Sequence, residues 1–292
     1  MRKVELVLGF KCNCRCVFCV VDSWTAARSM STAEALRHLA QARREGASAV
    51  DFGGGEPTLR PDLPDLARAA VKLGYRSIGV KSNGLRLCYP EYVEALLKAG
   101  LREFTVPVWG HVPEVHDALA RTEGAFEKLE LGIKNVVDLG GEVEADVLLT
   151  RLSVPRLREL VEAFADLGVR RFQMWLYCLF GSGGSRPELL PAMTAAGRAV
   201  ADTAGALRRR KLEITTTHIP PCLLRPRPSL YRNPASLGLR IITPGGSFAV
   251  EESPFEAGRK AAKCARCAKR ALCAGLRPEY LERFSGREVR PF

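Results

Sequence analysis

The sequence lacks three features, and each absence excludes a class of protein. No apolar stretch reaches the roughly 20 residues that a membrane-spanning helix needs, because Arg, Lys, Glu or Gly interrupts every one. No targeting segment is visible, since the opening residues MRKVELVLGF run directly into a strand-like pattern. The composition, with 47% hydrophobic and 26% charged residues, carries no sign of disorder. We therefore expect a folded, cytoplasmic protein with no membrane partner.

Cysteine, by contrast, is abundant, since the 292 residues include ten of them. Because nothing in the sequence marks the chain for secretion, a disulfide framework is not expected. Metal or cluster binding is the better explanation for so many thiols.

Positive charge is in excess and is unevenly distributed. Lys and Arg together number 44 against 32 Asp and Glu, which gives a net charge of +12. Much of the surplus lies late in the chain, in the stretches 208–211, 225–240 and 259–290. Such a surplus favours anionic partners such as phosphorylated metabolites, nucleic acid or an acidic peptide, and a solvated arginine-rich surface explains it equally well.

A repeated alternation of short apolar runs and amphipathic stretches occurs about six times before residue 215. The expected strands are residues 4–9, 49–52, 77–81, 104–108, 143–150 and 172–177. The expected helices begin near Thr32, Asp62, Pro90, Gly124, Pro155 and Pro191. Ser31 and Glu34 form a capping box before the first helix, and glycines at 46, 74 and 100 stand where helices should end.

This repeat predicts a parallel sheet covered by helices, because strand–helix–strand connections are right-handed. Six repeats are too few for the usual eight-stranded barrel, so the expected fold is an α/β, partial (β/α)6 TIM-like barrel over residues 1–215. Its ligand site should lie at the carboxyl ends of the strands.

Beyond residue 215 the pattern changes. A stretch rich in Pro and Arg runs to residue 234, a hairpin is expected around Gly245 and Gly246, and the end of the chain carries cysteines. Residues 216–292 are therefore expected to form a small C-terminal extension that binds its own Fe–S cluster.

Three cysteines follow the first expected strand directly. Cys12, Cys16 and Cys19 have the spacing C-x3-C-x2-C. Three thiolates on one tight loop can bind three irons of a cubane and leave the fourth iron open for a ligand. A zinc or electron-transfer site with Cys14 as fourth ligand is the alternative that spacing leaves open.

This loop, with Phe18 just before its last cysteine, resembles the signature of the radical S-adenosylmethionine (SAM) superfamily. The resemblance implies a [4Fe–4S] cluster whose open iron binds SAM, and reductive cleavage of SAM to a 5′-deoxyadenosyl radical. A reductant such as ferredoxin or flavodoxin is implied as partner.

Two later segments are similar to the same superfamily. The segment Gly54, Gly55, Glu56 and Pro57 follows the second strand and resembles the GGEP motif that holds the amino group of SAM. Ser82 and Asn83 follow the third strand and resemble a segment that approaches SAM. Arg151 is a candidate clamp for the SAM carboxylate. The resemblance covers about residues 1–215.

Four cysteines remain for the C-terminal region. Cys264, Cys267 and Cys273 have the spacing C-x2-C-x5-C, which looks like part of the SPASM or twitch extensions of radical SAM enzymes. Cys222 stands upstream in a Pro-Pro-Cys turn. The resemblance implies one auxiliary [4Fe–4S] cluster with Cys222 as a candidate fourth ligand, and a structural zinc is the rival assignment.

The substrate class stays open at this point. Auxiliary extensions are common among peptide-modifying relatives, so maturation of a ribosomally made peptide is our first expectation. A nucleoside or sugar-nucleotide metabolite, whose anionic groups the late arginines would suit, is the second, and RNA is the third. A non-catalytic electron carrier or zinc-binding adaptor is the alternative of another class. The lone Cys14, Cys88 and Cys178 are expected to be small core residues, with the alternative that Cys178, at the end of the sixth strand, faces the site and exchanges a proton or hydrogen atom.

Overall fold

The computed structural model describes residues 2–20, 28–253, 256 and 258–292, and in them nine strands form one curved sheet. The strands are β1 (Arg2–Val7), β2 (Ala47–Gly53), β3 (Ser77–Lys81), β4 (Glu103–Val108), β5 (Glu142–Leu149), β6 (Arg171–Leu176), β7 (Glu213–Thr216), β8 (Leu239–Thr243) and β9 (Gly246–Ala249). Their spatial order is β7-β6-β5-β4-β3-β2-β1-β8-β9. Every neighbouring pair is parallel except β8 and β9. The sheet does not close, which confirms a partial barrel.

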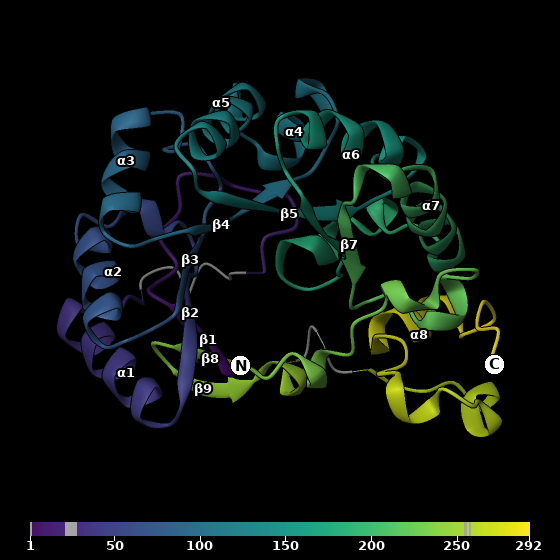
Figure 1. Cartoon of the computed structure of the whole chain (residues 1–292). Coiled ribbons are helices and arrows are strands. Elements are labelled where there is room, and N and C mark those ends of the chain that lie inside the picture. Colours follow the sequence, from purple (N-terminus) through teal and green to yellow (C-terminus); the bar gives the residue numbers. More distant parts are fainter. Residues whose placement is uncertain (1, 21–27, 254–255, 257) are drawn as a thin grey trace.

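Helices cover the convex side of this sheet (Figure 1). They are α1 (Thr32–Arg44), α2 (Leu63–Lys72), α3 (Pro90–Lys98), α4 (Pro113–Ala120), α5 (Ala125–Asp138), α6 (Leu157–Asp166) and α7 (Met193–Ala206). The expected capping box is present, because Ser31 accepts from the backbone of Glu34 while Glu34 accepts from the backbone of Ser31. Six strand–helix repeats therefore precede β7, as the periodicity predicts.

Two elements of the barrel were not predicted. Helix α4 is only eight residues long and has no side-chain cap, so its sequence carries little helical signal. Strand β7 is only four residues long and begins directly after a run of arginines, so it shows no alternation of useful length.

The two faces of the sheet differ in chemistry. Residues that face the helices are buried and apolar, for example Val4 and Leu6 in β1 and Phe104 in β4. Residues between them are polar and face the concave side, where Lys3 pairs with Asp51 at 2.8 Å and Lys81 with Glu5 at 2.7 Å. Because strand side chains alternate, the same strands build an apolar core outside and a polar chamber inside.

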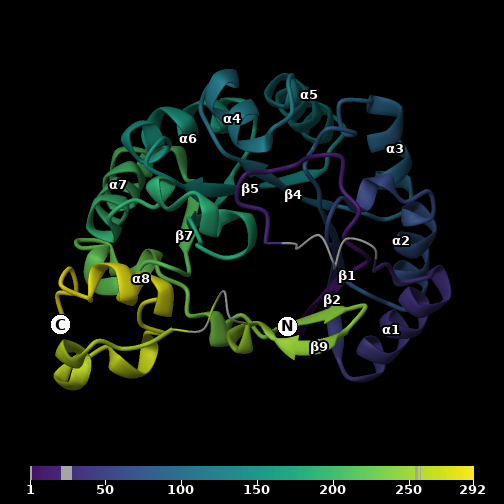
Figure 2. The ribbon, with the colours of Figure 1, turned by 180° about the vertical axis from the view of Figure 1, so that it is seen from behind.

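The expected hairpin is present as β8 and β9, and it extends the main sheet. Strand β8 lies parallel beside β1, with Leu239 opposite Lys3. The C-terminal segment 258–292, which includes α8 (Pro278–Phe284), lies at the opposite edge, near β7 and α7 (Figure 2). It is held there by hydrogen bonds from the start of α7, where Met193 N donates to Tyr280 Oη and Thr194 N to Glu288 Oε2.

Among the helices of the described residues, none has the length and apolar character that a membrane span requires.

Candidate functional site

The loop that carries the first three cysteines leaves β1 at its carboxyl end and is anchored on two sides. On one side, Arg15 N donates to Ala120 O at 3.3 Å and Val17 N to Leu119 O at 3.0 Å. Helix α4, absent from the sequence prediction, is therefore the support on which the loop rests. The Phe18 ring packs edge-on against Trp109 with centroids 4.6 Å apart.

Two glycines bring the segment after β2 against this loop. Gly54 has φ +123°, and a Cβ there would lie 2.2 Å from Gly9 O. A Cβ on Gly55 would lie 2.4 Å from Lys11 O. Only glycine fits such a close approach of the two segments. Two hydrogen bonds hold the segments together, from Gly55 N to Gly9 O and from Glu56 N to Lys11 O.

Glu56 ties the ends of β2 and β3 together. Its side chain is almost fully buried and accepts from Thr58 N, Thr58 Oγ1, Ser82 Oγ and Asn83 N at 2.5 to 3.0 Å. Burial raises the pKa of Glu56, and these four donors oppose that rise. The Glu56 carboxylate thus accepts its hydrogen bonds from the protein itself, and it positions Ser82 and Asn83 at the carboxyl end of β3.

The thiols of the N-terminal loop lie near one another. Burial, followed by the charges of Cys19 and Cys12, raises the pKa of Cys16 to about 12. Cys14 turns toward the end of β3, where its sulfur accepts from Asn83 Nδ2 at 3.4 Å. All ten cysteines are described, and none is in a disulfide.

These segments border one cavity of about 790 Å³ at the carboxyl ends of the strands, which we call the rim chamber. Its lining contains most of the residues predicted from sequence, namely Cys12, Cys16, Phe18, Cys19, Gly54, Gly55, Ser82 and Asn83. A cavity of this size is typical of sites for cofactor-sized ligands.

Three predicted residues do not line the rim chamber. Glu56 and Pro57 are buried behind its wall. Arg151 is exposed, and its Nε donates to Leu190 O at 3.1 Å, so its placement lends no support to a carboxylate clamp. The cations that do line the chamber are Lys11, Arg15, Lys81 and Arg121. Sequence reasoning missed Arg121, which ends α4 with a φ of 50° and belongs to no motif.

The donor chemistry of the rim chamber fits an iron–sulfur cluster and SAM. The thiols of Cys12, Cys16 and Cys19, with that of Cys14 beside them, open onto a space far larger than a closed metal site needs. Cationic side chains and the polar groups of Ser82 and Asn83 line the same space, as a ligand with a carboxylate and an ammonium requires.

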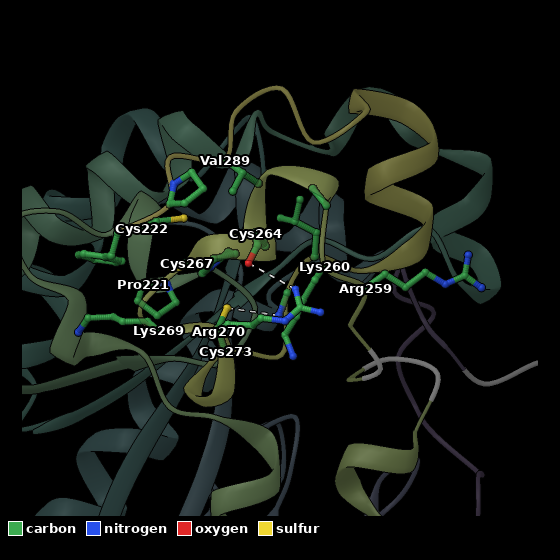
Figure 3. A pocket seen from close by; sticks show the side chains of 16 residues that line it. Pro221, Cys222, Arg259, Lys260, Cys264, Cys267, Lys269, Arg270, Cys273 and Val289 are labelled. Atoms are coloured by element: carbon green, nitrogen blue, oxygen red, sulfur yellow. Dashed lines mark hydrogen bonds between the residues drawn. The ribbon is translucent and has the colours of Figure 1, made fainter.

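The second group of cysteines gathers at the far edge of the sheet (Figure 3). Cys222 lies in a turn that begins Pro220–Pro221, and Cys264, Cys267 and Cys273 come from the C-terminal segment. All four line one small cavity, about 30 Å³, whose walls include Leu276, Val289, Pro291 and Phe292. Burial raises the pKa of Cys273 to about 11, and the charges of Cys222 and Cys264 add to this rise. A hydrogen bond from Gly275 N opposes it.

Cations surround this second group. Arg259, Lys260, Lys269 and Arg270 line its cavity, and Arg270 Nη1 donates to Cys264 O at 3.3 Å. Four thiolates around a cubane make an anionic centre, which such cations stabilise. In the described part of the chain, no three His, Cys, Asp or Glu side chains converge as closely as one metal ion requires.

The open α/β barrel and the thiol loop at the carboxyl end of its first strand are together typical of barrel proteins that bind an iron–sulfur cluster. Residues 6–152 match the family model described as the Radical SAM superfamily, and the chain belongs to this family. Membership implies a [4Fe–4S] cluster and SAM as its cofactors.

Two curated relatives illustrate the breadth of the family. The chain is 28% identical over 190 residues to an AdoMet-dependent heme synthase of Methanosarcina barkeri, covering 64% of this chain and 53% of that protein. It is 27% identical over 176 residues to a probable GTP 3′,8-cyclase of Saccharolobus islandicus, covering 60% of this chain and 56% of that protein. The chain thus spans about half the length of the curated relatives it matches.

One solved structure extends the likeness of fold beyond the barrel. Streptococcus suis SuiB bound to precursor peptide SuiA superposes with a TM-score of 0.73 at 16% identity, covering 94% of this chain and 71% of that one. At such low identity the likeness concerns the fold alone.

Proposed function

We propose that the protein is a radical SAM enzyme in which Cys12, Cys16 and Cys19 hold the [4Fe–4S] cluster that binds SAM. The observation that carries this proposal is the rim chamber, where the three thiols, the glycine segment and the end of β3 border one cavity. The cluster, when bound, supplies the electron that cleaves SAM into methionine and a 5′-deoxyadenosyl radical.

The chain's own residues place SAM and keep water out. Gly54 and Gly55 let backbone polar groups approach the ligand, and Ser82 and Asn83 offer hydrogen bonds beside them. Phe18 forms an apolar wall with Trp109. Glu56 and Pro57 act as positioning residues, since neither lines the chamber. Arg121 is a better placed partner for the SAM carboxylate than Arg151.

The second proposal concerns residues 216–292, where Cys222, Cys264, Cys267 and Cys273 hold one auxiliary [4Fe–4S] cluster. All four thiols line one cavity, which supports Cys222 as the fourth ligand. Zinc needs four sulfurs within roughly 4 Å of one another, because its bonds to sulfur are about 2.3 Å long.

For the substrate we propose a peptide. The fold likeness to SuiB in its peptide-bound form spans most of the chain and supports this choice. A nucleotide substrate has its support in the similarity to the GTP cyclase. However, none of the arginines from Arg208 to Arg290 lines the rim chamber: Arg240, for example, pairs with Glu45, and Arg225 stacks on Phe292. We also propose a ferredoxin or flavodoxin as reductant and the cytoplasm as location.

The test of the enzyme proposal is anaerobic reconstitution with iron and sulfide, followed by dithionite and SAM. Release of 5′-deoxyadenosine that depends on dithionite is the expected result. A fully loaded preparation that releases none would contradict the proposal and would favour a non-catalytic electron carrier. Iron analysis accompanies the assay, because two cubanes require about eight irons per chain.

A further inference from the structure

A second cavity, which we call the inner chamber, continues from the rim chamber into the concave side of the sheet. Its volume is about 370 Å³. The two cavities share Phe18, Lys81, Trp109 and Asp146 in their walls. A group held in the inner chamber would therefore lie next to the ligand of the rim chamber.

A continuous row of side chains crosses the inner chamber. Trp175 in β6 donates from Nε1 to Asp146 Oδ1 in β5 at 2.9 Å. The His218 ring, just after β7, meets the Trp175 ring edge-on with centroids 4.9 Å apart. His218 Nε2 lies 2.9 Å from Glu256 Oε1. The row thus has a carboxylate at each end.

Two acceptors in this row are buried and have no hydrogen-bond partner in the part of the chain that the structure describes. His218 and Glu256 are each only 7% exposed. Burial, followed by the charge of Arg277, lowers the pKa of His218, so its ring is neutral and Nε2–H donates to the carboxylate. His218 Nδ1 is then an acceptor, and neither it nor Glu256 Oε2 has a hydrogen-bond partner among the described residues. Since buried polar groups are normally satisfied, these two atoms offer an acceptor pair for a donor that the described residues do not supply.

The cations of the inner chamber are already engaged. Arg277 donates from Nη2 to the backbone oxygens of Leu176 and Tyr177, and its Nε lies 3.2 Å from Glu279 Oε1. Lys81 pairs with Glu5 at 2.7 Å.

The lining holds three carboxyl groups, Glu5, Asp146 and Glu256, and the two cations Lys81 and Arg277, each of which is already paired with a glutamate. Burial raises the pKa of Asp146 to about 7 in spite of the opposing charge of Lys81, so this carboxyl is partly protonated near neutral pH. Glu256, at the other end of the row, pairs with no Lys or Arg of the described residues.

We propose that the inner chamber binds the reacting group of the substrate, and that this group is a protonated amine or guanidine on an apolar stem. Glu256 and His218 accept from its nitrogen, and the aromatic rings of Trp109 and Trp175 pack along its stem. This inference rests on the proposed function: for a peptide substrate, the group is a lysine or arginine side chain. Glu256 and His218 are then specificity-determining residues.

The test measures binding by calorimetry to the reconstituted full-length protein with SAM present. Three capped tripeptides serve as probes, with a central lysine, arginine or norleucine, the last having a similar stem without the charge. We expect at least one cationic probe to bind about tenfold more tightly than the norleucine probe. Glu256→Gln should remove this preference, and His218→Gln should reduce it. Glu251→Gln is the matched control, since Glu251 is exposed and does not line the chamber.

Each outcome decides the inference separately from the proposed function. Equal binding of the three probes, or no binding of the cationic ones up to roughly 10 mM, would overturn the inference. A preference that survives Glu256→Gln would overturn the role of Glu256, provided that iron content and melting temperature match the parent protein. Release of 5′-deoxyadenosine without probes tests the enzyme proposal alone, so either proposal can fail while the other stands.

Discussion

The two cysteine regions of this protein use the same ligand in opposite settings. The N-terminal loop offers four thiols, with Cys12 exposed and Cys14 outside the predicted ligand set, to a chamber of about 790 Å³. The C-terminal region places four thiols, with Cys222 buried, around a cavity of about 30 Å³ whose walls combine proline and aliphatic side chains with four cations. The open site leaves room for a ligand, whereas under our proposal the four thiols of the closed one would saturate its cluster. The difference teaches that the surroundings of a cysteine, more than its spacing, separate a reactive centre from a structural or electron-transferring one.

The largest expected effect is on SAM cleavage. Cys16→Ala should lower the rate of 5′-deoxyadenosine formation at least about 100-fold, because it removes a ligand of the open site. Cys267→Ala should keep measurable cleavage, because its thiol belongs to the closed site. The assay is chromatographic detection of 5′-deoxyadenosine under dithionite, with Cys88→Ala as control. Complete loss of cleavage in Cys267→Ala would break the comparison.

The second-largest expected effect is on the iron content of variants in the two cysteine regions. Cys264→Ala should reduce iron from about eight to about four per chain, if a cubane is lost as a unit. Cys16→Ala should lose a similar amount from the other site. Colorimetric iron analysis, with hydrogen exchange of segment 258–292, measures both. Exchange should increase in that segment only for Cys264→Ala, and zinc in place of iron in the parent protein would refute the auxiliary cubane.

A substitution beside the cysteine loop that removes no thiol should test the first region further. Glu56→Ala leaves three partners, Thr58, Ser82 and Asn83, without their buried acceptor. We expect SAM to bind about tenfold more weakly and the protein to lose about 1–3 kcal/mol of unfolding free energy. Equilibrium binding of SAM and urea unfolding are the measurements, and exposed Glu91 in α3 provides the control Glu91→Ala. Unchanged SAM affinity would show that the rim does not depend on this carboxylate.

The smallest expected effect comes from His116, which lies in α4 beneath the cysteine loop. Burial lowers its pKa to about 4 from an ordinary value of 6.5. Below pH 6.5 His116 therefore binds a proton in the unfolded chain but not in the folded one, so the free energy of unfolding falls as the pH drops. Between pH 7.5 and 5.5 we expect a loss of roughly 1 kcal/mol from this group.

The measurement for His116 is urea unfolding at both pH values in the parent protein and in His116→Gln. The variant should show a smaller pH dependence, because it has no group to protonate at this position. An equal pH dependence of the unfolding free energy in both proteins would mean that His116 does not contribute to it.

The sequence by itself determined the features that depend on neighbouring residues. Apolar periodicity predicted six strand–helix repeats, the box of Ser31 and Glu34 predicted the start of α1, and Gly245-Gly246 predicted the hairpin. The spacing of Cys12, Cys16 and Cys19 after a strand indicated the open site. These signals are local, because a helix cap or a tight turn involves only residues a few positions apart.

Only the tertiary structure decided what meets inside the barrel. Asp146, Trp175, His218 and Glu256 come from separate elements, and strand register and the long segment after β9 bring them into one row. The same holds for Arg121, which reaches the rim chamber while Arg151 does not. The lone Cys178, expected in the core, lines the inner chamber. Contacts between residues distant in the chain depend on how the sheet curves and on which edge each segment joins. Neither of these can be read from a local sequence pattern.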